Sequence, residues 1–364
     1  MKFKVDKTDL LSGVQTVQNI ITSKAALPIL SNILIETHHD NTLRLSATDL
    51  DVGISCVIPV DIQEVGAITV PAKRFGDIAR DLPGDTVNIS TKKNNSVVIE
   101  TESCQFKIMG LPREEFPKLP EFKNKEAVCL EQAMLKEMLV LTSFAVSFDE
   151  TRYILNGILF KLNKNNIILV ATDGKRLAIV ERKLKQAIDR EVRIIVPLKT
   201  IHELNRNLTD EGEVSFLLGN NQALFDLGGV VIISRLIEGE FPDYQQVIPP
   251  VSEHKVKVDR EQFLLAVKRG ALLSTPDYQA VKLEIFKDKV VVSKSTPDIG
   301  ESREEVGVEY KGKEMMIGFN PNYLADVLKN LRNETVEFEL TDSEKPGVIR
   351  VEGYVYIVLP MRLG

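Results

Sequence analysis

The chain has 364 residues, of which 43% are hydrophobic, and a formal net charge of −6 at pH 7. At roughly 100 to 200 residues per domain, this length predicts two or three folded domains. No apolar run reaches the roughly 18 residues that a membrane-spanning helix needs, and the charged start MKFKVDKTDLL lacks the apolar core of a signal peptide. We therefore expect a folded protein in the cytoplasm without a membrane partner.

Cysteine and histidine predict neither a metal site nor a cofactor. Cys56, Cys104 and Cys129 have neither close pairing nor the spacing of zinc ligands. His38 and His39 precede Asp40-Asn41, a turn signal, so a solvated turn is expected there.

The chain repeats itself with the period of a whole domain. Ala47-Thr48-Asp49 returns as Ala171-Thr172-Asp173, a shift of 124 residues between positions 49 and 173, and Thr296-Pro297-Asp298 is a looser third copy. Solenoid repeats have periods of about 20 to 50 residues. The longer interval instead predicts three tandem domains, at residues 1–121, 127–248 and 253–364, joined by short polar linkers that contain proline.

Each repeat is predicted to follow one order of elements. A strand leads to an amphipathic helix, an apolar hairpin ends at the aspartate motif, and a further strand, a second helix and two closing strands complete the repeat. The first helices are expected within residues 6–22, 131–147 and 259–273, and the second within 72–81, 197–208 and 320–332. Two helices and about eight strands per repeat predict an α+β domain with helices on one face of an antiparallel sheet.

The helical periodicity also predicts which residues face the core. In the opening helix, Asp6 is the expected N-cap. The apolar positions at helical spacing are Leu10, Leu11, Val14, Val17 and Ile21 in the opening helix, and Phe75, Ile78, Ala79, Leu82, Ile201, Leu204, Leu208, Leu324, Val327, Leu328 and Leu331 in the second helices.

The sequence contains no familiar catalytic or nucleotide-binding motif: it has no GxxxxGK[ST], GxGxxG, HExxH or GxSxG pattern. Two interpretations of the repeated aspartates remain open. After an apolar strand, Asp49 and Asp173 can serve a metal-dependent enzyme as ligands or general bases. They can also cap turns, with Gly174 supplying the backbone angle. The altered third copy favours capping, because repeated active sites would keep their polar residues.

The charge is unevenly distributed. The six helix windows contain 12 basic and 10 acidic residues, a net of +2, which leaves −8 for the rest of the chain. Ordinary solvated helix faces explain this pattern. A second interpretation is that the helices line one mildly basic cavity that holds a phosphate backbone loosely and without sequence preference.

Several longer motifs occur in register along the whole chain: MKFKV, LPILSNILI, VPAKRF, YILNGILF, ATDGKRLA, GEFPDY and LPMRL. Together, from Met1 to Leu363, they resemble the bacterial DNA polymerase III beta subunit, the sliding-clamp family. The resemblance implies a non-catalytic, ring-shaped processivity factor in which two three-domain chains form six clamp domains around duplex DNA. It implies as partners a second copy of the chain, duplex DNA, the clamp loader, the replicative polymerase and other proteins with clamp-binding motifs.

The resemblance also implies three sets of site residues. For DNA contact these are Lys24, Lys73 and Tyr153, with Arg152 added as a neighbour, whereas Asp149 and Ile154 depart from the glutamine and tyrosine of well-known members. For the contact between two chains they are Arg74, Phe106, Ile108, Leu272, Leu273, Asp298, Glu301 and Glu304, with Phe106 and Ile108 expected on Leu272 and Leu273.

A groove for partner peptides is the third implied site. Its residues are Leu155, Thr172, Gly174, Lys175, Arg176, Leu177, Pro242, Val247, Leu359, Pro360, Met361, Arg362 and Leu363. Leu177, Pro242, Val247 and Met361 are expected to form its apolar floor, and Lys175 and Arg176 to bind polar peptide atoms. Lys175, Gln246, Glu344 and Pro346 depart from the usual residues, so the preferred peptide is expected to differ.

Overall fold

The computed structural model describes residues 1–21, 27–120, 122, 127–188, 191–219 and 221–363. The chain forms two compact units. Unit 1 contains Met1–Lys136 and Lys199–Leu236, and unit 2 contains Glu137–Leu198 and Ile237–Gly364. The middle repeat is therefore divided between the two units.

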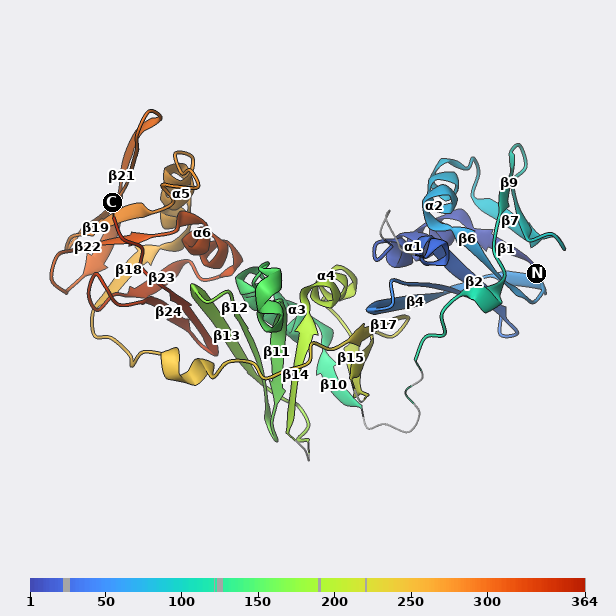
Figure 1. The fold of residues 1–364 in the computed structure, drawn as a ribbon, viewed down its shortest axis with the longest axis horizontal. Coiled ribbons are helices and arrows are strands. Elements are labelled where there is room, and N and C mark those ends of the chain that lie inside the picture. The colour runs from blue at the N-terminus through green and yellow to red at the C-terminus, as the bar shows by residue number, and fades with distance from the viewer. Residues whose placement is uncertain (22–26, 121, 123–126, 189–190, 220, 364) are drawn as a thin grey trace. The chain divides into compact units, whose positions relative to one another are not determined.

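The first repeat keeps the predicted order of helices and hairpin (Figure 1). Three strands and not one lie between the aspartate motif and the second helix, and three strands and not two close the repeat. Its elements are β1 (Lys2–Asp6), α1 (Lys7–Gln18), η1 (Pro28–Ser31), β2 (Asn32–His38), β3 (Thr42–Thr48), β4 (Val52–Pro59), β5 (Asp61–Glu64), β6 (Ala67–Pro71), α2 (Ala72–Asp81), β7 (Thr86–Thr91), β8 (Ser96–Glu100), β9 (Gln105–Met109) and η2 (Arg113–Glu115).

The other two repeats keep this order. The second contains β10 (Val128–Glu131), α3 (Gln132–Thr142), η3 (Ser143–Ala145), η4 (Glu150–Leu155), β11 (Gly157–Leu162), β12 (Asn166–Thr172), β13 (Arg176–Lys183), β14 (Val192–Pro197), α4 (Leu198–Asn207), β15 (Glu213–Leu218), β16 (Gln222–Asp226), β17 (Val230–Arg235) and η5 (Tyr244–Val247). The third contains β18 (Lys255–Asp259), α5 (Arg260–Ala271), β19 (Val281–Ile285), β20 (Lys289–Thr296), β21 (Gly300–Tyr310), β22 (Met315–Phe319), α6 (Pro321–Asn330), β23 (Thr335–Glu339), β24 (Gly347–Val351) and β25 (Tyr354–Val358).

The strand pairing is antiparallel throughout the described residues, which agrees with the predicted fold class. In unit 1, one sheet has the order β5-β1-β7-β8-β9 and another the order β10-β15-β16-β17-β4-β3-β2-β6. In unit 2, one sheet runs β14-β11-β12-β13-β25-β24-β23-β18-β21-β20-β19-β22. Helices α1 and α5 pack on β3 and β4 and on β18, β20 and β21, respectively, and pair with α2 and α6.

The helix predictions are mostly confirmed. The Asp6 side chain accepts hydrogen bonds from the backbone N–H groups of Thr8 and Asp9, as expected of an N-cap. The predicted core positions are buried except for Leu11, Ile21 and Ile78, which are half-buried. A helix buries a stripe, and Leu11 and Ile78 lie at its margin, whereas Ile21 follows the end of α1 at Gln18.

Two strand pairs carry the sheets across repeat boundaries. In unit 1, β4 of the first repeat pairs with β17, the last strand of the second, from Val52 with Ser234 to Cys56 with Val230. In unit 2, β13 of the second repeat pairs with β25, the last strand of the third. Each repeat therefore offers its last strand to the preceding repeat, an arrangement that the linear pattern of apolar residues does not reveal.

Candidate functional site

The repeated aspartates cap tight turns. Asp49 Oδ1 accepts hydrogen bonds from Asp51 N (3.1 Å) and Val52 N (2.8 Å). Asp173 Oδ1 likewise accepts from Lys175 N (2.8 Å) and Arg176 N (3.0 Å), around Gly174 with φ +85°. No group of three or more His, Cys, Asp and Glu side chains among the described residues is placed to hold a metal ion. The geometry therefore favours the capping interpretation.

Arg176, at the start of β13, is the centre of a network in unit 2. Its side chain is only 8% exposed. Its Nε donates to Asp173 Oδ2 at 3.0 Å, Nη1 donates to Asp326 Oδ2 at 2.6 Å, and Nη2 donates to the Phe144 carbonyl. The guanidinium also lies 4.4 Å from the ring centroid of Tyr323. Asp326 and Tyr323 belong to α6, so Arg176 ties the second repeat to the third.

The electrostatics of this network keep Arg176 charged. Burial lowers the pKa of the guanidinium, but the Tyr356 hydroxyl and the Asp326 and Asp173 carboxylates together outweigh it, and the net shift is upward. Arg176 was expected to bind polar atoms of a partner peptide, whereas here it already bonds within the chain. Its direct effect in this structure is to position the residues around it.

The segment after β25 is fixed along two strands. Leu359 N donates to Lys175 O at 2.9 Å, and Met361 N donates to Gly318 O at 2.8 Å. A Cβ atom on Gly318 would lie 2.6 Å from Met361 O and 2.8 Å from Leu363 Cδ2. Only glycine permits this close approach, and LPMRL is therefore an ordered part of unit 2.

The remaining groove residues are partly brought together. Leu155 packs against a buried apolar cluster that contains Leu177, Phe241 and Tyr244. The Thr172 hydroxyl donates to Arg176 O at 2.6 Å and accepts from Gly174 N at 3.0 Å, which holds the turn beside this cluster. Pro242 is exposed; Val247, Leu359 and Leu363 are 58%, 44% and 39% exposed. Leu177 is buried rather than surface-exposed, so it supports the apolar surface from below.

The candidate DNA residues of the second repeat lie on η4. Arg152 and Tyr153 are exposed, Tyr153 by 56%. Asp149 caps η4 by accepting hydrogen bonds from Thr151 Oγ1 (2.6 Å) and Thr151 N (3.0 Å), which lower the pKa of its carboxyl, with a smaller contribution from Arg152. Ile154 packs against the apolar cluster instead of facing solvent. The two departures thus place a negative charge and a half-buried aliphatic residue on this segment.

Basic residues on the other helices differ in their partners. Lys7 and Arg260 donate to backbone carbonyls. Ion pairs within one unit are formed by Arg80, Lys136, Lys199, Arg206 and Arg269, with Asp77, Asp210, Asp49, Glu203 and Glu304, respectively. Within the described residues, Lys73, Arg74, Lys268, Lys329 and Arg332 have no such partner. Lys73 and Arg74 are exposed on α2, and Lys24 lies outside the described residues. Lys73 and Arg74 are therefore free to bind an external anion or carboxylate.

The candidate chain-to-chain residues of the first repeat lie on an edge strand. β9 is the last strand of its sheet, and Phe106 and Ile108 pair with the buried residues Ile99 and Val97 of β8. Phe106 is 38% exposed and Ile108 half-buried. Met109, which the sequence analysis missed, is 58% exposed on the same strand.

The candidate residues of the third repeat surround the end of α5 and the start of β21. Leu272 is 80% exposed, Leu273 is half-buried, and Asp298 and Glu301 are exposed. Glu304 accepts hydrogen bonds from Arg269, which lower the pKa of its carboxyl. Tyr278 and Ile299, which the sequence analysis did not single out, are 49% and 54% exposed. An exposed apolar residue inside an otherwise polar turn would have been the only signal for them.

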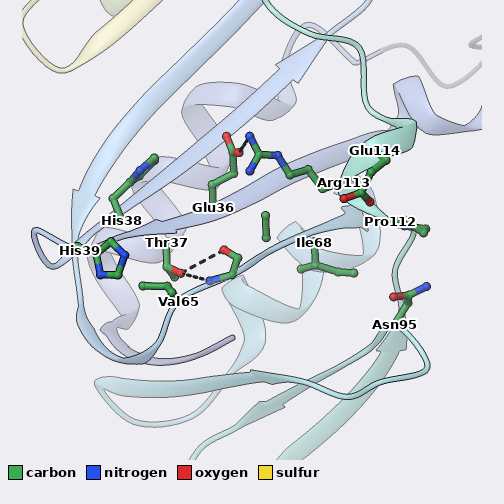
Figure 2. A pocket seen from close by; sticks show the side chains of 12 residues that line it. Glu36, Thr37, His38, His39, Val65, Ile68, Asn95, Pro112, Arg113 and Glu114 are labelled. Carbon is green, nitrogen blue, oxygen red and sulfur yellow. Dashed lines mark hydrogen bonds and ion pairs between the residues drawn. The ribbon is translucent and has the colours of Figure 1, made fainter.

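Two cavities of unit 1 lie away from all these residues. One, of about 1100 Å³, lies on the sheet under the segment after η2. The other, of about 490 Å³, is shown in Figure 2, where Arg113 pairs with Glu36 at 3.0 Å and the Thr37 hydroxyl exchanges hydrogen bonds with Gly66. Neither cavity is lined by a predicted site residue.

The chain matches three domain families, one after another. They are the N-terminal, central and C-terminal domains of the DNA polymerase III beta subunit, at residues 1–120, 129–243 and 245–362. The chain is 32% identical to the beta sliding clamp of Chlamydia pneumoniae over 364 residues, which cover 100% of this chain and 99% of the relative. It is 34% identical over 370 residues to that of Pseudomonas putida, with full coverage of both.

Solved structures agree. The DNA polymerase sliding clamp from Bacillus subtilis superposes with a TM-score of 0.95 at 31% identity, and a sliding clamp from Pseudomonas aeruginosa bound to griselimycin with 0.94 at 34% identity, both covering 100% of each chain. Three tandem clamp repeats without a catalytic centre define a DNA sliding clamp. The chain belongs to the bacterial DNA polymerase III beta-subunit family, the beta sliding clamps. It is a non-catalytic protein of DNA replication, and the enzyme interpretation of Asp49 and Asp173 is wrong.

None of the helices within the described residues has both the length and the apolar character needed to cross a membrane.

Proposed function

We propose that two copies of this chain close into a six-domain ring around duplex DNA. The main supporting observation is the rule by which neighbouring repeats pair: the last strand of one repeat joins the fourth strand of the repeat before it, as β17 joins β4 and β25 joins β13. Among the described strands of the kind that this rule pairs, two lack a neighbouring repeat. They are β9, the last strand of the first repeat, and β21, the fourth strand of the third, whose Gly300–Glu305 part pairs with β20. The same rule pairs these edges between copies, head to tail and twice, which closes the assembly.

An aromatic pair inside unit 2 supports the side-chain part of this contact. Phe144, after α3, and Tyr356 of β25 have ring centroids 5.8 Å apart. Leu272 and Phe144 hold equivalent positions, because each lies 13 residues after the last residue of the strand before its helix, Asp259 and Glu131. Phe106 and Tyr356 are also equivalent. Each lies two residues after the residue that closes its hairpin turn, Cys104 opposite Thr101 and Tyr354 opposite Val351. Repeat equivalence therefore sets Leu272 of one copy against Phe106 of the other.

Charge complementarity supports the same pairing. In unit 1, Lys199 donates to the carboxylate of Asp49 and, at 3.2 Å, to Ile20 O. Lys73 holds the equivalent position of α2, two residues after Pro71, and Asp298 lies in the turn after β20 as Asp49 lies in the turn after β3. Lys73 and its neighbour Arg74 then face an acidic surface of Asp298 and Glu301 across the contact. We therefore expect Lys73 to stabilise the contact that closes the ring, in addition to the DNA contact that the resemblance implies.

The mechanism is topological. A closed ring cannot leave circular DNA without opening, so weak contacts from Lys24, Lys73, Arg152 and Tyr153 to phosphates suffice, and tight ones would slow sliding. Salt weakens such contacts but leaves a closed ring in place. The proposed setting is the cytoplasm, with a clamp loader to open the ring.

The direct test is to load the protein onto circular plasmid DNA with its clamp loader and ATP and then to cut the circle once. The expected result is retention through gel filtration before cutting and loss after it. Equal retention on both forms would overturn the topological mechanism.

The contact itself is tested by mass in solution and by one matched pair of variants. The wild-type protein should have twice the 40.8 kDa mass of one chain. Phe106→Ser should give a folded monomer, whereas Val65→Ser, which alters a 45% exposed apolar residue away from β9, should remain a dimer. A monomeric wild type contradicts the proposed ring.

We further propose that the apolar surface of unit 2 around Leu155, Val247 and Leu359 binds short peptides of the replicative polymerase and other partners through an apolar anchor residue. The support is the ordered LPMRL segment beside β13, and the related Pseudomonas aeruginosa clamp was solved bound to griselimycin. Pro242, Met361 and Leu363 extend this surface. Lys175 supplies an exposed charge for polar atoms of the peptide, and Arg176 holds the wall.

Deleting residues 360–364 should leave the dimer intact and abolish binding of a polymerase-derived peptide in a fluorescence anisotropy titration. A matched test is Gly318→Ala, whose Cβ would push Met361 and Leu363 away without removing them. Peptide affinity equal to wild type in the truncated protein contradicts the assignment of this surface.

A further inference from the structure

Lys294 is a buried lysine in a surface-forming part of the third repeat. It lies on β20 and is only 5% exposed. Its Nζ donates hydrogen bonds to Tyr278 O at 2.6 Å and to Ala280 O at 2.8 Å. Lysine is among the residues least often fully buried, because its ammonium group loses hydration. Here two carbonyl oxygens replace water.

The other repeats show what this position ordinarily requires. Lys294 is the sixth residue of β20, as Ala47 is of β3 and Ala171 is of β12. Both alanines are fully buried. A small apolar side chain is thus sufficient for the fold at this place in two repeats. The third repeat has a long cationic one, and desolvation lowers the pKa of its ammonium group, which records the cost of burying it.

The segment that Lys294 holds connects α5 to β19, residues 272–280. It is tied a second time by the Thr296 hydroxyl, which donates to Leu273 O at 2.5 Å. The segment contains Leu272, 80% exposed, and Tyr278, 49% exposed, which are the apolar side chains of the proposed contact surface. Without β20 to hold it, an exposed connection of this kind would sample many conformations and lose entropy on association.

We propose that Lys294 is a positioning residue that fixes residues 272–280 in the conformation needed to receive β9 of a second copy. The inference rests on the proposed head-to-tail contact. Its ammonium group touches no partner atom itself. It acts by holding two backbone carbonyls, so that Leu272 and Tyr278 are in place before association.

The test is Lys294→Met in the full chain, which keeps the side chain's length and removes its donors. The matched control is Lys287→Met, which alters an exposed lysine in the turn between β19 and β20. Dimer dissociation is measured by sedimentation across a dilution series. Hydrogen exchange of amides 274–280 and affinity for the polymerase peptide are measured on the same samples.

The expected result for Lys294→Met is a dimer dissociation constant raised about tenfold to a hundredfold, the cost of ordering about two further side chains on association. Exchange should quicken in residues 274–280, while the rest of unit 2 exchanges as in the wild type and peptide affinity stays within error. Lys287→Met should change none of these.

A purely structural role for Lys294 predicts instead that Tm, peptide affinity and dimerisation fall together, and that outcome would overturn the proposal. Unchanged dimerisation in the folded variant overturns it too. If Lys294→Met fails to fold, Thr296→Val, which removes the second tie, is measured in the same way and must weaken the dimer. A wild-type protein that is monomeric at all concentrations would refute the proposed ring. Failure of the ring can therefore be distinguished from failure of the role proposed for Lys294.

Discussion

The two junctions between repeats have the same backbone and different side chains. In unit 1, the outer face of β3 and β4 presents Ser46, Gly53 and Ser55, and in unit 2 the equivalent positions of β12 and β13 hold Val170, Leu177 and Ile179. The small residues of unit 1 leave the cavity of about 1100 Å³, which Leu119 helps to cover. In unit 2 the larger side chains pack together as one apolar cluster and fill the equivalent space.

This difference is the reason for which we propose the peptide-binding surface at the junction of unit 2 and not at that of unit 1. In unit 1 the chain's own linker covers the sheet, since a Cβ on Gly53 would meet Leu119 Cδ2 at 2.7 Å. In unit 2 the linker residues Phe241 and Tyr244 complete the cluster and leave Val247 exposed beside it. Backbone strand pairing is enough to join two repeats. Whether a partner can bind at the junction depends on the side chains that cover the paired strands.

The largest expected change in the free energy of unfolding comes from removing the ion pairs at the junctions between repeats. Arg176→Met should lower the free energy of unfolding of unit 2 by roughly 2 to 4 kcal/mol, because the carboxylates of Asp173 and Asp326 lose their partner in a partly buried site. The matched change in unit 1, Lys199→Met, should cost less than about 1 kcal/mol, since the side chain of Lys199 is 38% exposed.

Native-state hydrogen exchange, which reports on each unit separately, measures both. An equal loss of unfolding free energy in the two units would contradict the view that Arg176 stabilises its junction more than Lys199 does.

A middle-sized effect is expected from making unit 1 resemble unit 2. Gly53→Leu introduces the residue that unit 2 has at position 177 and should destabilise unit 1 by roughly 1 to 3 kcal/mol, because it collides with Leu119. Adding Leu119→Ala should recover most of that loss in urea unfolding. A double variant no more stable than Gly53→Leu would show that the linker does not depend on this contact.

The smallest effects concern the tyrosines, all seven of which lie in unit 2. The Tyr354 hydroxyl is buried and, among the described residues, has no hydrogen-bond partner, whereas Tyr356 donates to Tyr323 O at 2.8 Å. At neutral pH, Tyr354→Phe should therefore be neutral or slightly stabilising, and Tyr356→Phe should cost about 1 kcal/mol in thermal unfolding. A loss for Tyr354→Phe as large as for Tyr356→Phe would contradict the contact pattern.

At alkaline pH both substitutions should become stabilising relative to the wild type. Burial raises the pKa of both hydroxyls, so the folded state retains protons that the unfolded state releases, and unit 2 loses stability as pH rises above the ordinary tyrosine value of about 10. Either Phe variant should resist this loss. In unit 1 the corresponding group is Cys56, whose thiol pKa burial raises to about 12, and Cys56→Ala should protect unit 1 in the same pH scan.

Much of the fold was predictable because its signals are local. The Asp6 cap, the helical spacing of Val14 and Val17 and the turn at Asp173 each depend on residues within a few positions, and the structure confirms them. Leu177 shows the limit: its apolar character was clear, but whether it is exposed to a peptide or buried beneath one depends on Phe241 and Tyr244, more than 60 residues away in sequence.

By itself, the sequence determined the threefold period, the order of the elements and the residues that resemble a sliding clamp, since each is written in spacing along the chain. Only the tertiary structure decided that the middle repeat is shared between two units, that Arg176 is already bonded and that Lys294 holds residues 272–280. These are contacts between residues that are distant in sequence. The chemistry of a strand edge, a guanidinium or an ammonium group does not determine which of several possible hydrogen-bond partners it will have.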